Sequence, residues 1–174
     1  MPAAARFVDD LGRRVLAVLG DRSLDRAARL ERLTKILDEA TDLALVARLV
    51  LGRYWREASE AQRREFVDLF RRLLLKTMSD RLDSYGGETY EILGARAVDE
   101  RDTMVFTRIL RPQGEPIAVD WRVRDLGGRF VLVDVVAEGV SMVVTQRSEA
   151  AEIVGRSGID GLLAEMRRRL AQSS

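Results

Sequence analysis

The spacing of hydrophobic residues changes twice along this chain, from a helical period to a period of two and back. Between about residues 90 and 136 apolar and polar side chains alternate, which predicts strands because successive side chains of a strand point to opposite faces. On both sides of this segment apolar residues recur every three or four positions, as on one face of a helix. The order helices, strands, helices favours a single α+β domain over residues 1–174.

Four strands are expected, at Tyr90 to Val98, Thr103 to Arg111, Ile117 to Arg124 and Phe130 to Val136. The turns between them are short, so neighbouring strands should pair antiparallel. In the third strand one face is apolar and the other is charged; the apolar face carries Ile117, Val119, Trp121 and Val123, and the charged face carries Asp120, Arg122 and Arg124. We therefore expect helices packed on one face of a curved four-stranded antiparallel sheet, enclosing an apolar cavity.

The N-terminal half carries signals for several helices. A first helix should end near Gly20, with Ser23 as the N-cap of a second helix. Residues 43–51 predict a helix that is apolar all round except for Arg48, and such a helix must be buried or must line something apolar.

The longest helix is expected to begin at a capping box, Ser59 to Gln62, and to end at Gly86-Gly87. After the strands, Ser141 is the expected cap of one helix, and Ser157 to Asp160 opens a last amphipathic helix.

Composition excludes several classes of function. The chain has no histidine and no cysteine, which rules out a Ser-His-Asp triad and thiolate chemistry. A net charge of +1, with basic and acidic residues interspersed, argues against nucleic acid as a partner. No apolar run reaches the roughly 20 residues of a membrane span. The start, Met1 to Ala5, lacks the apolar core of an export signal, so either the protein is cytosolic or its signal has been removed.

Residues that could carry chemistry are few. Asp120 or Asp134 in an apolar cavity would have a raised pKa and could act as a base, but the alternation of the strand favours a solvated ion pair between Asp120 and Arg122. Ser141 lacks the Gly-x-Ser-x-Gly elbow and an activating histidine, which favours capping over a role as nucleophile. No catalytic residue, metal or cofactor is therefore expected. The alternative is an enzyme on the cone-shaped fold of the ketosteroid-isomerase-like type, with a strand carboxylate as base.

The helices offer more apolar surface than one four-stranded sheet can cover, and this excess predicts a lipid-binding site. A filled, dry core is the competing interpretation. We hypothesise that acyl chains lie between the apolar face of the sheet and the helices. The residues predicted to contact lipid are Leu45, Leu49, Val50, Tyr54, Phe66, Leu69, Phe70, Leu73, Leu74, Met78, Val119, Trp121 and Val123.

Two blocks of sequence resemble a known family. The run from Gly52 to Gln62, continued by Phe66, Phe70, Leu73 and Leu74, matches the pattern G-x-x-W-R-x-A-[ST]-x-x-Q-x-x-x-F-x-x-x-F-x-x-L-L. Asp120-Trp121-Arg122, the run Asp134 to Met142, and Gln146 to Glu149 form the second block. Together they resemble the MlaC family of periplasmic phospholipid-binding proteins, also called toluene-tolerance or auxiliary ABC-transport proteins. The resemblance runs from about Phe7 to Leu170; Met78 and Ala150 depart from it, since the family often has an aromatic residue at the first position and usually Phe at the second.

The resemblance implies a non-enzymatic periplasmic carrier with a bound phospholipid as cargo. Such a carrier would move lipid between an outer-membrane lipoprotein complex and an inner-membrane ABC transporter that bears an MCE-domain protein, and so maintain outer-membrane lipid asymmetry. A periplasmic location implies that an export signal has been removed.

Overall fold

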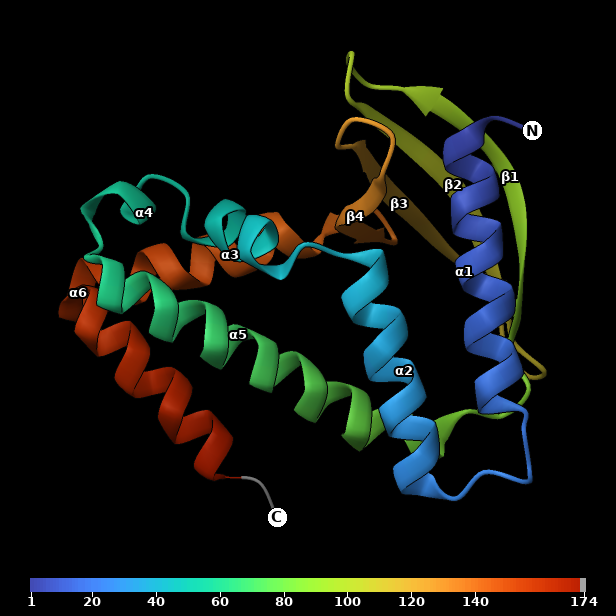
Figure 1. Cartoon of the computed structure of the whole chain (residues 1–174), viewed down its shortest axis with the longest axis horizontal. Helices are drawn as coiled ribbons and strands as arrows, with labels where there is room; N and C mark the ends of the chain where they lie inside the picture. Colours follow the sequence, from blue (N-terminus) through green and yellow to red (C-terminus); the bar gives the residue numbers. More distant parts are fainter. Residues whose placement is uncertain (173–174) are drawn as a thin grey trace. The chain divides into compact units, whose positions relative to one another are not determined.

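The computed structural model describes residues 1–172, which form two compact units (Figure 1). The sheet unit comprises residues 1–42 and 81–142, and the helical unit comprises residues 43–80 and 143–172. The chain therefore crosses from one unit to the other three times, after Asp42, Asp80 and Met142. Each unit has an apolar cluster of its own and is described by itself.

The sheet unit is built on a curved, open antiparallel sheet with the order β1-β2-β3-β4-β5. Its strands are β1 (Thr89–Ala97), β2 (Asp102–Leu110), β3 (Ile117–Asp125), β4 (Phe130–Ala137) and β5 (Val140–Ser141). The four predicted strands and their meander order are confirmed. β5 is an addition, because a strand of two residues is too short to show an alternating pattern.

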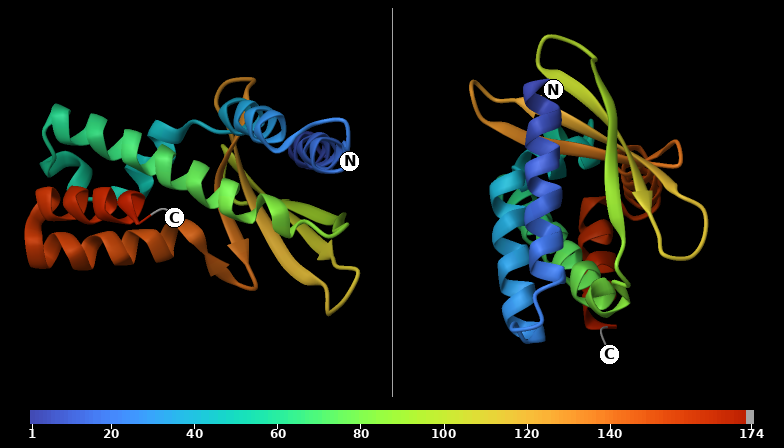
Figure 2. Two further views of the ribbon diagram at one scale, coloured as in Figure 1. Left: turned by 90° about the horizontal axis from the view of Figure 1, so that it is seen from below. Right: turned by 90° about the vertical axis from the view of Figure 1, so that its right-hand side faces the viewer.

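Two helices cover the apolar face of this sheet, as predicted. α1 (Ala3–Leu19) contacts β1 and β2, and α2 (Arg26–Ala40) contacts α1 and β4. Figure 2 shows α1 and α2 running alongside each other against the sheet. Ala4, Ala5 and Val8 of α1 bury themselves against Val105 of β2 and Val123 of β3. A short 3-10 helix, Leu82–Ser84, leads into β1.

The N-cap of α2 is Asp25, so the prediction of Ser23 was wrong. The Asp25 carboxylate accepts a hydrogen bond of 2.8 Å from the backbone N–H of Ala28. The Ser23 hydroxyl instead donates to the Asp21 carboxylate, at 2.6 Å. Both residue types cap helices well, and Asp25 adds a negative charge beside the positive end of the helix dipole.

The helical unit contains α3 (Leu43–Leu51), α4 (Tyr54–Glu57), most of α5 (Glu60–Arg81) and most of α6 (Met142–Ala171). The apolar helix predicted at residues 43–51 is confirmed. The prediction that a last helix opens at Ser157 to Asp160 is confirmed, because α6 consists of two helices that meet at Gly158, whose φ of 73° and ψ of 177° are not helical. None of the described helices is long and apolar enough to span a bilayer.

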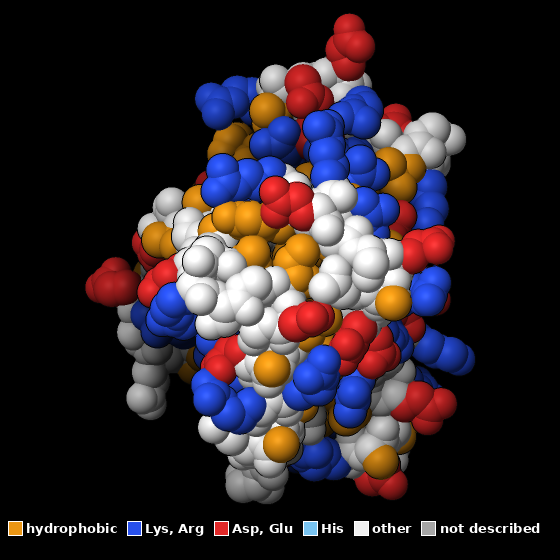
Figure 3. Space-filling view, turned by 90° about the vertical axis from the view of Figure 1, so that its left-hand side faces the viewer, with side chains coloured by type: hydrophobic (Ala, Val, Ile, Leu, Met, Phe, Trp, Pro, Cys, Tyr) orange, Lys and Arg blue, Asp and Glu red, His pale blue; other side chains and the backbone are white. Residues whose placement is uncertain are grey.

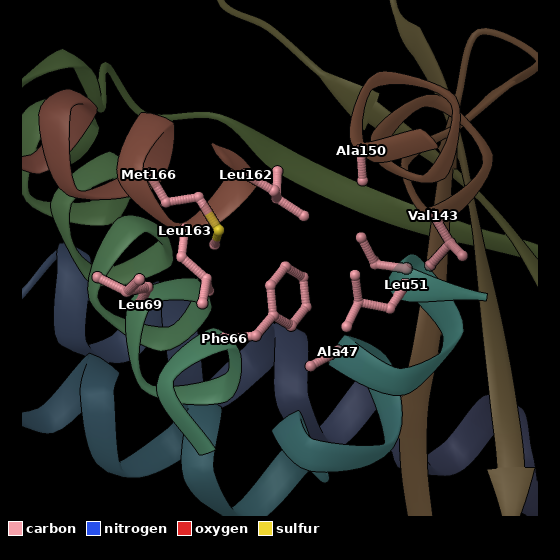
Figure 4. Packing of buried hydrophobic residues seen from close by; sticks show 10 residues of the cluster. Ala47, Leu51, Phe66, Leu69, Val143, Ala150, Leu162, Leu163 and Met166 are labelled. Carbon is pink, nitrogen blue, oxygen red and sulfur yellow. The ribbon is translucent and has the colours of Figure 1, made fainter. Parts of the chain in front are cut away.

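The core of the helical unit is a cluster to which α3, α5 and α6 contribute (Figure 4). The ring of Phe66 points into its centre, toward Ala47 and Leu51 of α3 and toward Leu163 of α6. Ala150, Leu162 and Met166 of α6 close the cluster. Residues far apart in the sequence thus share one apolar core.

Candidate apolar binding site

The first sequence block forms the N-terminal end of α5. The Ser59 hydroxyl accepts from the backbone N–H of Gln62, at 3.1 Å, and the Gln62 amide oxygen accepts from the backbone N–H of Ser59, at 2.8 Å. This reciprocal pair confirms the predicted capping box. The Gln62 amide also donates to Asp160 of α6, at 2.9 Å. Gln62 therefore fixes the start of α5 and ties it to a second helix.

The two sequence blocks meet where α3 ends. Gly52 has a φ of +56°, a conformation that glycine adopts at helix C-termini without strain. The Arg147 side chain of the second block lies where a Cβ at Gly52 would approach to 3.3 Å, and its Nε donates to the Leu49 carbonyl at 2.8 Å. Arg147 thus satisfies a carbonyl that α3 itself leaves without a partner.

The second block also shapes the end of the sheet. Glu138 and Gly139 both have positive φ, 50° and 80°, as the central residues of a type I′ turn require. Ala118 of β3 exchanges two hydrogen bonds with Glu138: its N–H donates to the Glu138 carboxylate, and its carbonyl accepts from the Glu138 N–H, each at 2.9 Å. The Ser141 hydroxyl donates to the Asp134 carboxylate across the hairpin. These polar residues of the block hold a turn in place.

The lipid-contact residues predicted in the helical unit fall into three groups. Val50, Phe66 and Leu69 are buried members of its core. Leu49, Tyr54, Phe70 and Leu73 are partly buried and pack against that core. Leu45, Leu74 and Met78 are half-buried and do not belong to the core cluster.

The third group marks apolar surface that the helical unit does not bury in its own core. On α5 only Phe66 and Leu69 are fully buried, so burial stops halfway along the helix. Beyond that point Leu74, Leu75 and Met78 are only partly buried. Leu75 was not among the residues predicted to contact lipid, although it lies three positions before Met78 on the same face of the helix. This part of α5 is the best candidate surface for an apolar ligand within the helical unit.

In the sheet unit, the predicted residues Val119 and Val123 are buried and Trp121 is partly buried. Val123 is a buried member of the cluster beneath α1, and Trp121 packs against that cluster. The Trp121 indole N–H donates to the Thr107 hydroxyl at 3.0 Å, and that hydroxyl donates to the Val119 carbonyl at 2.6 Å. Trp121 is therefore held in one orientation, with its polar atom satisfied inside the sheet.

The predicted ion pair between Asp120 and Arg122 was wrong. Arg122 donates instead to Asp102, at 2.6 Å. Asp120 has no hydrogen-bond or ion-pair partner within residues 1–172, and it lies between Phe106 and Val136 in the strand register. Burial raises the pKa of Asp120, the direction that a general base would need. Strand alternation nevertheless places it on the face opposite Val119 and Trp121, and no second acid or base pairs with it.

A charged network at the start of β2 was not foreseen. Asp102 is 0% exposed, and its carboxylate accepts from Arg124 at 2.7 and 2.9 Å as well as from Arg122. Burial acts to raise the pKa of Asp102, but the hydrogen bonds from Arg124 and Arg122 outweigh it and leave the pKa lowered. Asp102 follows a run of charged turn residues, so nothing in the local pattern marked it as buried.

Comparison with known proteins identifies the group to which these features belong. The family model described as "MlaC protein" matches residues 9–168, nearly the whole chain. The chain belongs to the MlaC family. We therefore expect other MlaC proteins to have counterparts of the features described above.

Three relatives illustrate the match. The intermembrane phospholipid transport system binding protein MlaC of Haemophilus influenzae is 26% identical over 127 residues, covering 71% of this chain and 59% of that protein. The toluene tolerance protein ttg2D of Pseudomonas putida is 22% identical over 131 residues, covering 75% of this chain and 61% of that protein. The matches thus span about three fifths of the length of either curated relative.

The third relative has a solved structure. The phospholipid-binding protein from Ralstonia solanacearum, determined in complex with a phospholipid, superposes with a TM-score of 0.84 and is 26% identical. The comparison covers 98% of each chain. The α+β fold predicted from the sequence is therefore that of an MlaC-type protein, with one more strand than expected.

Proposed function

We propose that this chain is a phospholipid carrier that works in the periplasm and has no enzymatic activity. The observation that carries the proposal is the Ralstonia solanacearum structure, which holds a phospholipid in a chain that matches this one over 98% of its length. The partly buried apolar side chains of α5 support it, because an acyl chain would remove their remaining exposed surface from water.

The physical need for such a carrier is large. Exposing acyl chains to water costs about 0.8 kcal/mol for each CH₂ group, so a diacyl lipid leaves a bilayer very slowly by itself. An apolar protein site offers the chains a solvent similar to the bilayer. Uptake and release are then nearly balanced, and the direction of transport has to come from the partner proteins.

We assign the thirteen predicted residues different roles in this function. Leu45, Leu74 and Met78, with Leu75, are the proposed chain-contacting residues of the helical unit, and Leu49, Tyr54, Phe70 and Leu73 form the border of that surface. Val50, Phe66 and Leu69 support it from the core. Val119, Trp121 and Val123 are the proposed contribution of the sheet.

The proposed partners follow from family membership. They are a lipoprotein complex of the outer membrane and an inner-membrane ABC transporter with an MCE-domain protein. Movement of phospholipid between them would maintain the lipid asymmetry of the outer membrane.

Lipid extraction and mass spectrometry of the protein purified from bacteria test the proposal. We expect co-purified phospholipid in the unaltered protein and a clear loss of it in Leu74→Glu, which places a charge among the chain-contacting residues. The matched control is Leu93→Glu, because Leu93 of β1 is 56% exposed and lies outside the proposed site. Protein without phospholipid, or equal loss in both variants while both remain folded by circular dichroism, would contradict the proposed function.

A further inference from the structure

The helical unit presents arginines and aromatic rings together at the turn between α3 and α5. We call residues 53–64 the arginine-rich turn. Together with Arg48 just before it, this region carries five arginines and two glutamates between residues 48 and 64, in a chain whose net charge is only +1. Positive charge is therefore concentrated here.

Two aromatic side chains of the turn are anchored on the core and topped by arginines. Tyr54 and Trp55 both pack against the core cluster of the helical unit. The Arg53 guanidinium lies 4.9 Å from the centroid of the Tyr54 ring and donates to its hydroxyl at 2.9 Å. The Arg63 guanidinium lies 5.1 Å from the Trp55 ring and donates to the Trp55 carbonyl at 2.7 Å.

The indole N–H of Trp55 and two of the arginines of the turn are left available to a partner. The indole N–H of Trp55 has no hydrogen-bond partner within residues 1–172, yet no buried side-chain nitrogen or oxygen there lacks one, so this N–H reaches solvent. Arg56 and Arg64 are exposed and make no ion pair with any described residue. Glu57 attracts Arg53, and Glu60 is the other acid of the turn.

We propose that the arginine-rich turn docks on the headgroup surface of an anionic phospholipid bilayer. Tryptophan and tyrosine favour the boundary between apolar and aqueous layers, because their rings are apolar and their N–H or O–H groups are polar. Arginine pairs well with lipid phosphates, and its apolar stem can lie along the boundary while its charge stays in the headgroup layer. On the face drawn in Figure 3, Lys and Arg side chains and Asp and Glu side chains are interspersed with apolar side chains that reach the surface. The proposal does not depend on the cargo that the protein carries.

Sedimentation with lipid vesicles tests it. Vesicles of equal parts phosphatidylglycerol and phosphatidylcholine should bind the protein, vesicles of phosphatidylcholine alone should not, and added salt should weaken binding through screening. Removing two arginine charges with the double variant Arg56→Gln, Arg64→Gln should weaken binding by about tenfold or more. The matched control is Arg22→Gln with Arg101→Gln, since both arginines are exposed residues of the sheet unit and the net charge changes equally.

Fluorescence supplies a second measurement at the turn itself. The chain has two tryptophans, so Trp121→Phe leaves Trp55 as the single indole. Its emission should shift to shorter wavelength on anionic vesicles and stay unchanged on phosphatidylcholine. The proposal is overturned by absence of binding, by equal weakening in the two double variants, or by binding without a shift at Trp55. Cargo lipid measured in the Arg56→Gln, Arg64→Gln variant keeps the two proposals apart, because it should be unaffected.

Discussion

The two units stabilise themselves with different chemistry. Both buried polar residues of the described chain, Asp102 and Thr107, lie in the sheet unit, where they bind Arg122, Arg124 and Trp121. The buried residues of the helical unit are all apolar, and its side-chain hydrogen bonds, such as that of Arg167 to Glu65, lie outside this core. Directional hydrogen bonds fix the sheet unit in one arrangement, whereas dispersion and the hydrophobic effect fix the helical unit with less directional preference. An apolar surface of that second kind is suited to flexible acyl chains.

The largest effect is expected from Phe66→Ala, which removes the central ring of the helical core. Such a truncation leaves a cavity and should lower the free energy of unfolding by about 3–5 kcal/mol. Thermal and urea unfolding, followed by circular dichroism, measure it. We propose that residues 1–174 unfold as one domain, because the three chain crossings interleave the units. In that case the Trp121 signal of the sheet unit shifts together with the helical signal; separate transitions would refute the single domain.

Asp102→Asn should have the next largest effect, through the sheet unit. It removes the negative charge that Arg122 and Arg124 share and should cost about 2 kcal/mol at neutral pH. The pKa of Asp102 is lowered in the folded state, so its stabilising contribution is present above the ordinary value of 3.8 and is lost as the pH falls through the folded pKa. The difference between variant and unaltered protein should therefore shrink in acid. A difference independent of pH from neutral to acid would show that the charge does not stabilise the sheet unit.

Gly12→Ala should be destabilising by about 1 kcal/mol although alanine favours helices. A Cβ at Gly12 would lie 2.5 Å from ring carbons of Tyr90, whose hydroxyl donates to Asp9 at 2.8 Å. Burial and the contact with Asp9 raise the pKa of Tyr90 to about 12, and displacement of the ring should lower it. Absorbance titration of the tyrosines and thermal unfolding measure both effects.

The matched control for Gly12→Ala is Gly155→Ala in α6, where an added Cβ meets no atom within 4 Å. This variant should be stabilising by about 0.5–1 kcal/mol, from helix propensity alone. Equal effects in the two variants would mean that the position of the Tyr90 ring does not require glycine at position 12.

The smallest effect is expected from Asp120→Asn, and its sign is opposite to that of Asp102→Asn. Because burial raises the pKa of Asp120 in the folded state, ionisation of this group lowers stability as the pH rises through its folded pKa. The variant should match the unaltered protein well below pH 3.8 and be slightly more stable at neutral pH. Destabilisation at neutral pH would reveal a favourable contact of the carboxylate.

Local patterns were enough for much of this fold. The apolar run from Leu43 to Leu51, the capping box at Ser59 and the alternating residues of β3 each depend on neighbours in sequence, and each was predicted correctly. Short-range periodicity reports which face of an element is apolar.

What escaped prediction depends on partners remote in sequence. Arg122 of β3 pairs with Asp102 of β2, which is remote in sequence. Asp120, the partner predicted from the sequence, is only two residues from Arg122. The choice of Asp25 over Ser23 as the N-cap of α2 is the exception, because it is a local contact that residue type alone does not decide. Within the candidate site, periodicity found the apolar residues of α5 but could not separate Phe66, which fills the core, from Met78, which is only partly buried.

The interleaved connectivity also determines when this protein can fold during its synthesis. The sheet unit is incomplete until β5 has been made, and the helical unit is incomplete until Leu162, Leu163 and Met166 have been made. Neither unit can therefore be completed from the first half of the chain alone. Until those residues of α6 have been made, the apolar helix of residues 43–51 lacks part of the core that buries it.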